Sequence, residues 1–393
     1  IMPEEFDGPH TPEPKYVKVP LSWASSKGEG HSFPSKGYAT YRLRIKTGDQ
    51  PDFLALQVGD VFTAYKLYVN DSLLSQVGEA GKSASRSSPD FIQREIPLSH
   101  LMKEHDTLEL VFHVSNFYHT KAGLQKPLYI GENQQIVKAG KRSFALNLII
   151  IGIILIIGLN HLALYVLRKV DTSNLYFGLL CLVMILRNLT SGERVILFFF
   201  FYMDWSWLMK LDNFSAFCTI PFFALFFHVL FKKEFSRKIL IPFVAIGGII
   251  AGIIFATPNL IYNQFQMFYQ LYLLLGGIYL LFFVLLRASF KQRKGAFLTF
   301  IGFLALYGTA INDVLSNMEL VNTPFIAPFG LAFYMILQSF MITRKSADAM
   351  KSNENLSAEL MEEKKNLEDK VEKRMNELTQ QNQELISHRE KEK

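Results

Sequence analysis

Long apolar runs separated by short polar segments dominate the middle of the chain. A helix that crosses the hydrocarbon core of a bilayer needs about 20 predominantly apolar residues. Seven runs meet this requirement: residues 146–167, 174–191, 208–231, 239–257, 266–286, 295–315 and 325–343. The pattern therefore predicts a bundle of seven membrane-spanning helices within residues 141–345.

The segment between the second and third runs is also strongly apolar over residues 195–201. It can therefore extend a helix or lie in the membrane interface. Tyr202, Trp205 and Trp207 follow it, and Tyr and Trp are enriched at the boundary between membrane and water. The sequence leaves the ends of the second and third spans open at this point.

Residues 1–140 show a different pattern, in which apolar and polar residues alternate with the period of a β-strand. Turn residues such as Thr47-Gly48-Asp49 and Asn70-Asp71 separate the alternating runs. Strands are predicted over residues 38–46, 53–58, 62–70, 73–77, 91–98 and 107–115. Short strands at this spacing are typical of a β-sandwich that buries its own core.

Residues 346–393 contain neither Gly nor Pro and are rich in Glu, Lys, Gln and Asn. Apolar residues recur there at heptad spacing, at Leu360, Leu367, Val371, Leu378 and Leu385. Lys364, Arg374 and Gln381 fill the other seam positions, so a parallel dimeric coiled coil would be weak. Two interpretations stay open: a dimeric signalling helix with two packings of similar energy, or a solvated single helix.

Composition narrows the class of protein. Half of the residues are hydrophobic and only 19% are charged, which excludes a disordered chain, a collagen and a disulfide-stapled mini-protein. The net charge of +6 is distributed as −1 in residues 1–140, +10 in residues 141–345 and −3 in residues 346–393. Because the basic excess lies among the apolar runs, it argues against a nucleic-acid partner. The two cysteines, Cys181 and Cys218, lie in predicted spans, so no disulfide supports residues 1–140.

Basic residues are distributed unequally between the two sides of the predicted bundle. Twelve flank the ends of spans one, three, five and seven, whereas Lys141, Arg142, Arg194 and Lys210 lie on the other side. Cytoplasmic loops carry the excess of Lys and Arg, so we expect the N-terminal region outside and the C-terminus in the cytoplasm. The first residue is Ile, and we expect that a signal peptide preceded it.

Three runs of the N-terminal region carry a resemblance: GYATYRLRI, ALQVGDVFTAYKLYVNDSLLSQVGEAG and LELVFHVSNFYHTKAGL. They resemble the jelly-roll, galactose-binding-like fold of the non-catalytic sugar-binding domain of family 2 glycoside hydrolases. In that domain a strand ends in Y-V-N-G. Here Asp71 follows Asn70 in place of the glycine.

The VSNF…H…GL stretch also resembles the external domains of bacterial seven-transmembrane receptors with diverse intracellular signalling modules. The runs LYFGLLCLVMILRNLTSGER, INDVLSNMEL and APFGLAFYMILQSFMITRK resemble the membrane block of that family. The resemblance spans roughly residues 16–393. It implies a multi-domain membrane protein with an all-β jelly-roll sensor domain (1–140), a seven-helix transmembrane bundle (141–345) and a C-terminal coiled-coil helix (346–393).

The run KVEKRMNELTQQNQELISHREKEK resembles the connectors that precede histidine kinase, nucleotide cyclase or phosphatase domains in this receptor family. We therefore expect an output domain that is absent from this chain.

Loop residues of the N-terminal region are candidates for binding a small molecule. Aromatic faces stack on sugars, and Asn, Arg and Lys donate hydrogen bonds to hydroxyls or carboxylates. The candidates are Trp23, Arg86, Asn116, Tyr118, His119 and Lys121. The alternative is an ordinary polar loop that packs on the membrane domain.

Ionisable groups inside a membrane are costly and point to function. The polar residues within or beside the predicted spans are His161, Arg187, Glu193, Asp212, His228, Asn312 and Asp313. Glu193 lies more than one helical turn from Arg187, so we expect Arg187 to pair with Asp313. Such pairs lock an inactive helix arrangement or simply hold the bundle together.

The sequence predicts no catalysis, cofactor or metal site. No His cluster has metal-ligand spacing. The seventh span contains no Lys for a retinal Schiff base, and the chain has no nucleophile elbow, Walker A loop or HExxH motif.

The favoured interpretation is a dimeric receptor of the bacterial inner membrane. Its expected partners are a small-molecule ligand, for which a carbohydrate is one candidate, the lipid bilayer and a second copy. The alternative is a transporter or channel with an accessory carbohydrate-binding-like domain, although the spans show no inverted repeat and few midplane charges. A sugar-modifying membrane enzyme is a third class, and it lacks a recognisable acid/base pair.

Overall fold

The computed structural model describes residues 16–391 except for 17–18, 21, 24–26, 29–30, 33, 47–53, 93, 99–106, 170, 319 and 322. The predicted turn at Thr47-Gly48-Asp49 lies outside these described residues. The chain divides into two compact units, Ile1–Gln338 and Ser339–Lys393. We describe each unit by itself.

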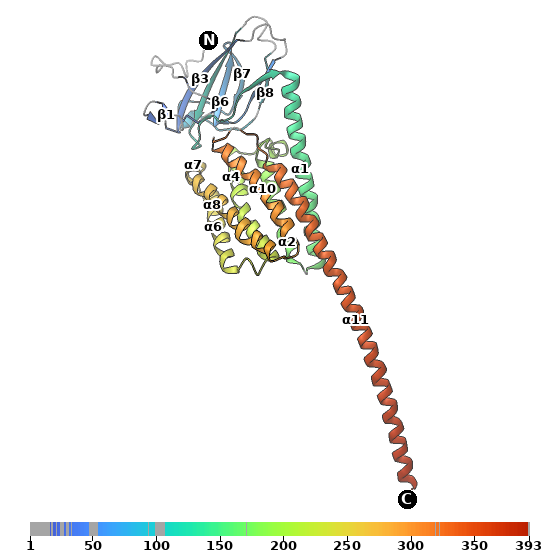
Figure 1. Ribbon diagram of the computed structural model, residues 1–393. Helices are drawn as coiled ribbons and strands as arrows, with labels where there is room; N and C mark the ends of the chain where they lie inside the picture. Colours follow the sequence, from blue (N-terminus) through green and yellow to red (C-terminus); the bar gives the residue numbers. More distant parts are fainter. Residues whose placement is uncertain are drawn as a thin grey trace. The chain divides into compact units, whose positions relative to one another are not determined.

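The first unit begins with two main antiparallel sheets (Figure 1). The larger has the order β3-β9-β6-β7, with β3 at Gly37–Lys46, β9 at Thr107–Asn116, β6 at Ala64–Val69 and β7 at Ser72–Val77. The smaller has the order β11-β4-β8, with β11 at Tyr129–Glu132, β4 at Leu54–Val58 and β8 at Arg94–Pro97. Two short pairs join β1 (Lys27–Gly28) to β2 (His31–Ser32), and β5 (Val61–Phe62) to β10 (Gly123–Leu124).

Both main sheets contribute side chains to one apolar core. Leu67 of β6 and Phe112 of β9 pack in the same cluster as Leu56 of β4 and Ile96 of β8, and all four are buried. The predicted strands thus form sheets that share one buried core. The predicted all-β region is confirmed as packed sheets, whereas its closure into a jelly roll stays a prediction.

Asn70 and Asp71 form the turn between β6 and β7. Asn70 and Asp71 have φ angles of 46° and 66°, the left-handed conformation that a tight hairpin turn requires. Asn and Asp tolerate this conformation better than other non-glycine residues. Asn70 Oδ1 also accepts a hydrogen bond from the main-chain N–H of Glu109 at 2.9 Å, which fixes the turn against β9.

A helix bundle follows directly on β11. Its long helices are α1 (Asn133–Arg168), α2 (Thr172–Thr190), α4 (Trp205–Phe217), α5 (Thr219–Leu230), α6 (Arg237–Ala256), α8 (Gln266–Ile278), α10 (Ala296–Asn317) and the start of α11 (Ala327–Lys391). Shorter elements are η1 (Ala84–Arg86), α3 (Ile196–Phe199), α7 (Asn259–Tyr262), η2 (Asn263–Phe265), the π-helical η3 (Tyr279–Leu285) and α9 (Leu286–Phe290).

Six helical stretches among the described residues are long and apolar enough to cross a membrane. They are Asn133–Leu167, Thr172–Thr190, Trp205–Leu230, Arg237–Ala256, Asn259–Phe290 and Ala296–Ser316. Each contains one of the first six predicted spans or matches it to within three residues at either end. The seventh predicted span, 325–343, is not among the six, and its helix begins at Ala327 as the start of α11.

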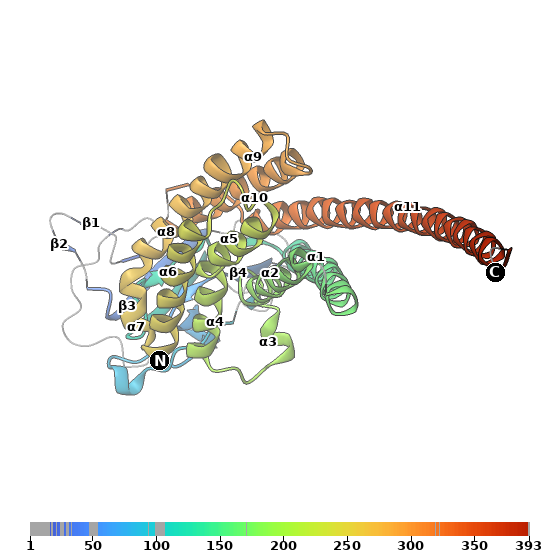
Figure 2. The same ribbon diagram turned by 90° about the horizontal axis from the view of Figure 1, so that it is seen from below.

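Consecutive helices pack side by side, α1 on α2, α2 on α4 and α5, and α5 on α6 (Figure 2). Small residues permit the close approach, because bulky side chains would hold the backbones apart. A Cβ atom added at Gly158 of α1 would lie 2.8 Å from Cβ of Cys181 in α2. The third span is divided at Cys218, and α5 begins there with Pro221 in its first turn, where a missing N–H is tolerated.

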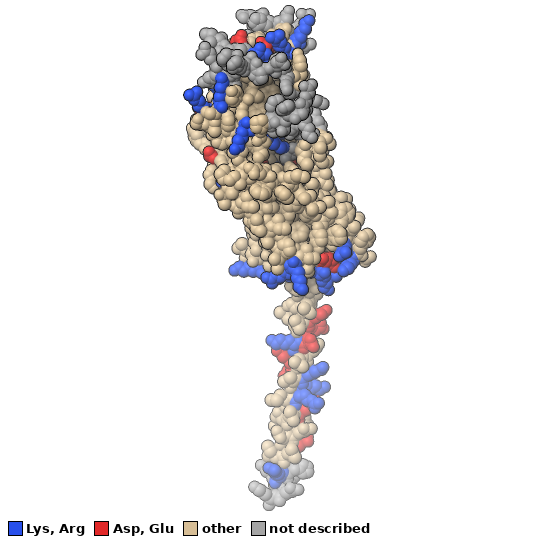
Figure 3. Space-filling view, turned by 90° about the vertical axis from the view of Figure 1, so that its left-hand side faces the viewer, with Lys and Arg blue, Asp and Glu red and all other residues tan. Residues whose placement is uncertain are grey.

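Charged side chains mark one end of the bundle in the first unit. In the face shown in Figure 3, basic side chains gather along the lower edge of a broad uncharged surface. Exposed apolar side chains of the bundle include Ile241, Ile249 and Phe282. Exposed basic residues lie in the α5–α6 segment (Lys232 and Lys233), in the first turn of α6 (Arg237 and Lys238) and in the α9–α10 segment (Lys291 and Lys294). An apolar surface bounded by cations is typical of a bundle embedded in lipid.

The second unit, Ser339–Lys393, is helical throughout its described residues as the continuation of α11. The predicted seam residues Leu360, Leu367, Val371, Leu378 and Leu385 are all exposed on this single chain. An exposed apolar stripe is compatible with a dimeric coiled coil and with a solvated single helix. The dimeric coiled coil itself stays a prediction.

Candidate functional site

The loop after β9 brings four of the predicted ligand-binding residues together, and Asn116 organises it. Asn116 is fully buried, and its Nδ2 lies 2.8 Å from Ser35 O, 2.7 Å from His119 O and 3.0 Å from Lys121 O. Its Oδ1 accepts from the main-chain N–H of His119 at 3.1 Å. The side chain of Asn116 therefore holds the shape of this loop and ties it to the segment before β3.

His119 lies at the centre of this loop and faces the helix bundle. Its Nδ1 accepts a hydrogen bond from the main-chain N–H of Lys121 at 2.9 Å. The ring stacks on Phe62 at 4.4 Å between centroids and meets Trp205 of α4 edge-on at 6.5 Å. Burial lowers the pKa of His119 to about 4, so the ring is neutral near pH 7.

The remaining predicted ligand-binding residues surround the same loop. Tyr118 Oη lies 2.9 Å from Ala84 O and 3.0 Å from Ser87 O, so it ties η1 to the loop. Arg86, in η1, is exposed. Trp23 donates from Nε1 to Pro34 O at 3.0 Å and from its main-chain N–H to Ala122 O at 3.2 Å. Their role in ligand binding stays a prediction.

An apolar cluster joins this region to the bundle. Its buried members are Phe91 of the β region and Ile196, Trp205, Leu208 and Met209 of α3 and α4. Phe62 and Tyr118 pack against them from the β region. Tyr118 and His119 pack on the helix bundle, which is the contact that the alternative of an ordinary polar loop predicted.

Asp60 was not among the residues predicted from the sequence. It lies beside this cluster, where the β region meets the helix bundle, and we call this contact region the junction. Its Oδ1 lies 3.3 Å from Nη1 of Arg194, in the segment between α2 and α3. Its Oδ2 lies 3.8 Å from Nζ of Lys126, in the segment between β10 and β11. The side chains of Asp60 and Arg194 are only 16% and 12% exposed, so water screens their attraction weakly. The guanidinium carbon of Arg194 also lies 3.1 Å from the centroid of the Phe91 ring.

Lys126 extends this junction to the connector before α11. Its Nζ lies 4.2 Å from the centroid of the Phe325 ring. Asp313 holds the next residues, because its Oδ1 accepts from Ile326 N–H at 2.9 Å and its Oδ2 from Ala327 N–H at 3.0 Å. A carboxylate at a helix start caps free N–H groups and favours the helix dipole. Asn312 fixes the same connector by accepting from Thr323 Oγ1 at 2.8 Å.

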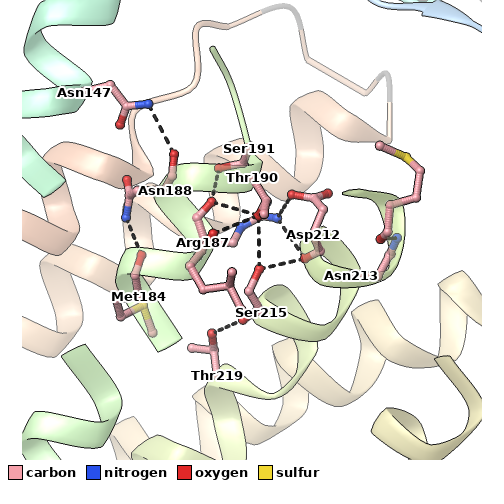
Figure 4. Close-up of polar contacts among 12 residues, drawn as sticks. Asn147, Met184, Arg187, Asn188, Thr190, Ser191, Asp212, Asn213, Ser215 and Thr219 are labelled. Carbon is pink, nitrogen blue, oxygen red and sulfur yellow. Dashed lines mark hydrogen bonds and ion pairs between the residues drawn. The ribbon is translucent and has the colours of Figure 1, made fainter. Parts of the chain in front are cut away.

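The partner expected for Arg187 is therefore wrong. Arg187 Nη1 lies 2.6 Å from Oδ1 of Asp212 and not beside Asp313 (Figure 4). The physical reason is topological: α2 and α4 pack together, and the last turn of α2 reaches the level of Asp212. Ser215 Oγ donates to Asp212 O at 2.9 Å and completes this polar group.

The other predicted membrane residues fall into separate pairs. Glu193 accepts from Ser143 Oγ at 2.7 Å, His161 Nδ1 lies 2.7 Å from Asn174 Oδ1, and His228 Nδ1 lies 2.7 Å from Phe235 O. The structure thus brings Arg187 and Asp212 together, and Asn312 and Asp313 together, but it describes no single network. Within the described ranges, no group of three or more His, Cys, Asp or Glu side chains could hold a metal ion.

Comparison with known proteins decides the family. The sequence profile of the family described as 7TM diverse intracellular signalling matches residues 143–345. The chain belongs to the 7TM diverse intracellular signalling family. It is therefore a multi-pass membrane protein whose bundle is a signalling domain.

Three of the solved structures that match do so over 29% or 30% of this chain. A glycosyl hydrolase family 2 member from Bacteroides cellulosilyticus DSM 14838 has a TM-score of 0.22 and 11% identity, over 29% of this chain and 16% of that chain. A β-glucuronidase from Ruminococcus gnavus has a TM-score of 0.24 and 15% identity, over 30% of this chain and 23% of that chain. A putative β-galactosidase from Bacteroides fragilis has a TM-score of 0.22 and 15% identity, over 29% and 18%. This chain thus spans less than a quarter of their length, and no curated protein sequence matches it.

In this member of the 7TM diverse intracellular signalling family, the ion pairs of Asp60 with Arg194 and Lys126 could not be predicted from the sequence. Asp60 follows Gly59 at the end of an alternating run, so it reads as an ordinary turn residue. Arg194 carried one signal, because it is among the few basic residues on its side of the bundle. Nothing in the sequence pairs the two, since 134 positions separate them.

Proposed function

We propose that the chain is a receptor whose β region detects a small molecule outside the cytoplasm and passes the change to the helix bundle. The observation that supports this most is the junction of Asp60 with Arg194 and Lys126. One carboxylate there meets a cation from the bundle and a cation that touches the connector to α11. A shift of the β10–β11 segment would therefore act on two separate parts of the bundle.

A ligand drives such a change only if it binds the two arrangements with different affinity. The junction suits this requirement because it combines an apolar cluster with a weakly solvated ion pair. Both kinds of contact are lost steeply when the surfaces separate, since an unpaired charge left in a poorly solvated site is costly. The two arrangements would then be distinct states rather than a continuous range.

The remaining parts of the proposal rest on the sequence pattern. The one-sided basic residues favour an N-terminal region outside and a C-terminus in the cytoplasm of a bacterial inner membrane. The exposed stripe of α11 favours a parallel dimer. We expect the output chemistry in a domain outside this chain, and no catalysis within it. A carbohydrate is the candidate ligand, because the strand runs resemble sugar-binding domains.

The test uses the full chain in nanodiscs that hold two copies, with a spin label at Val371→Cys. Galactose, glucose and glucuronic acid serve as probes, and the label-to-label distance is measured. We expect at least one sugar to shift the distance. The Asp60→Asn variant should bind that sugar and lose the shift. Asp71→Asn, a matched change at the exposed β6–β7 turn, should keep it.

Two outcomes would contradict the proposal. The first is an unchanged distance with every sugar, which would remove the link between the β region and α11. The second is accumulation of radiolabelled sugar inside liposomes that carry the purified protein, which would favour the transporter class.

A further inference from the structure

An aromatic segment, Phe198–Tyr202, joins α3 to the start of α4. Its residues are Phe198, Phe199, Phe200, Phe201 and Tyr202, and their exposed fractions run from 61% to 96%. The residues just before it face the other way, since Val195 and Ile196 are buried and Ile196 belongs to the junction cluster. The stretch thus has one face packed on protein and a second face that is wholly aromatic and uncovered.

The level of this segment along the bundle follows from its neighbours on α1. The Phe198 ring meets the Phe144 ring edge-on at 5.9 Å between centroids. One residue earlier, Ser143 donates to Glu193, and one turn later, Asn147 Nδ2 donates to Asn188 O at 3.3 Å. Lys141 and Arg142 precede Phe144, and the uncharged run of α1 follows it. The aromatic segment therefore lies where the charged start of α1 gives way to its apolar span.

The first turn of α4 has the same character. Trp207 is 55% exposed, and the Nζ of Lys210 lies 5.5 Å from its ring centroid. Lys210 Nζ also donates to Phe255 O near the end of α6 at 3.1 Å. An exposed Trp beside a Lys is typical of the level at which spans leave the hydrocarbon.

We propose that the aromatic segment is a lipid-binding surface, seated at the boundary between headgroups and acyl chains in the leaflet next to the β region. Aromatic rings favour that boundary, because it accepts their apolar faces and hydrates the Tyr hydroxyl. The partner is the bilayer surface and not a soluble ligand. A continuous aromatic patch exposed to water would be an aggregation hazard, whereas lipid covers it at this level.

The lipid contact also positions Arg194, which lies four residues before Phe198. The buried side of the segment packs in the junction cluster, and its exposed side is held by the bilayer. Arg194 is thereby kept within reach of Asp60 from two directions. The lipid seat itself does not depend on the proposed receptor function, because it follows from exposure and level alone.

The test measures the depth of a fluorescent label at Phe201→Cys, with Phe199→Cys as a second position. The full chain is reconstituted in phosphatidylcholine nanodiscs. Both native cysteines are buried, so the unsubstituted chain reports background labelling. Leu73→Cys is the matched control, because Leu73 is an exposed apolar residue of the β region. It pairs with Tyr68, which in turn pairs with Val111 of β9, five residues before Asn116.

We expect labels at Phe201 and Phe199 to be quenched by a nitroxide carried high on the lipid acyl chain, and less by one near the chain end. Quenching by aqueous iodide should be lost at both positions and kept at Leu73. Iodide quenching equal to that at Leu73, without nitroxide quenching, would overturn the proposal. So would protection from both quenchers that disappears at one chain per disc, because a second copy would then cover the segment.

Discussion

At the end of the bundle next to the β strands, Asp60 and Asp212 form ion pairs with cations, whereas at the opposite end many basic side chains are exposed. Asp60 meets Arg194 and Lys126 at the first end, and Arg187 meets Asp212. At the second end, Lys232, Lys233, Arg237 and Lys238 are all exposed. The difference teaches that a count of charges does not show which of them are paired, whereas the surroundings of each side chain do.

One group at the opposite end departs from this contrast. The side chain of Glu234 is only 2% exposed and lies 2.8 Å from Nε of Arg293 and 3.9 Å from Nζ of Lys291. It fastens the segment after α5 to the segment after α9. The relevant difference between the two ends is therefore whether a carboxylate is buried. Substitutions of its cationic partners at each end test how much each ion pair contributes to stability.

The largest effect is expected from Arg293→Met, which leaves the buried carboxylate of Glu234 without its closer partner. Breaking a buried pair costs about 3–5 kcal/mol of folding free energy. The exposed neighbour Lys294 offers the control, since Lys294→Met should change stability by no more than about 0.5 kcal/mol. Reversible unfolding in detergent micelles measures both. Equal, small effects would mean that Glu234 is solvated.

A pH effect of similar size is expected at the junction, from His119. Its pKa is about 4 in the folded chain against 6.5 ordinarily, so the unfolded chain binds more protons between these values. Stability is then complete above about pH 6.5 and falls as the pH drops toward 4. The loss reaches roughly 3 kcal/mol, at about 1.4 kcal/mol per pKa unit.

Unfolding as a function of pH measures this, with His119→Asn as the comparison. That variant should lose the part of the pH dependence that lies in this window. An unchanged pH profile would show that the ring is solvated and that the packing of Phe62, His119 and Trp205 is absent.

The smallest effect is expected from Lys126→Met, because Lys126 is the more exposed of the two cations at Asp60 and its ion pair is the longer. Loss of this pair and of the contact with Phe325 should cost about 1 kcal/mol. Hydrogen exchange of the connector before α11 should rise at the same time. Unchanged exchange there would separate Lys126 from the start of α11.

Sequence reasoning succeeded where one local pattern decides the structure. The apolar runs predicted the first six spans, and the alternating runs predicted strands such as β6 and β9. It failed for Arg187, since charge alone cannot choose between Asp212 and Asp313. That choice depends on which helices pack together. It also depends on the start of α11, where the main-chain N–H groups of Ile326 and Ala327 donate to Asp313.

Residues 195–201 show the intermediate case. Their hydrophobicity left two alternatives open, the extension of a helix or a position in the membrane interface. The structure forms the short helix α3 over Ile196–Phe199 and leaves the side chains from Phe198 onward exposed. Ile196 packs in the junction, whereas the side chains from Phe198 onward are exposed. A run without alternation carries no signal for such a division, because every position has the same polarity. Only the packing of neighbours reveals which side is covered.

The central claim is that the β region and the helix bundle are energetically coupled through Asp60. A double-mutant cycle with Asp60→Asn, Arg194→Met and the double variant measures this coupling most directly, from the free energy of unfolding of each. The account predicts a coupling of about 1–2 kcal/mol, because the two side chains touch in a poorly solvated site. Additivity of the two substitutions to within about 0.3 kcal/mol would contradict it.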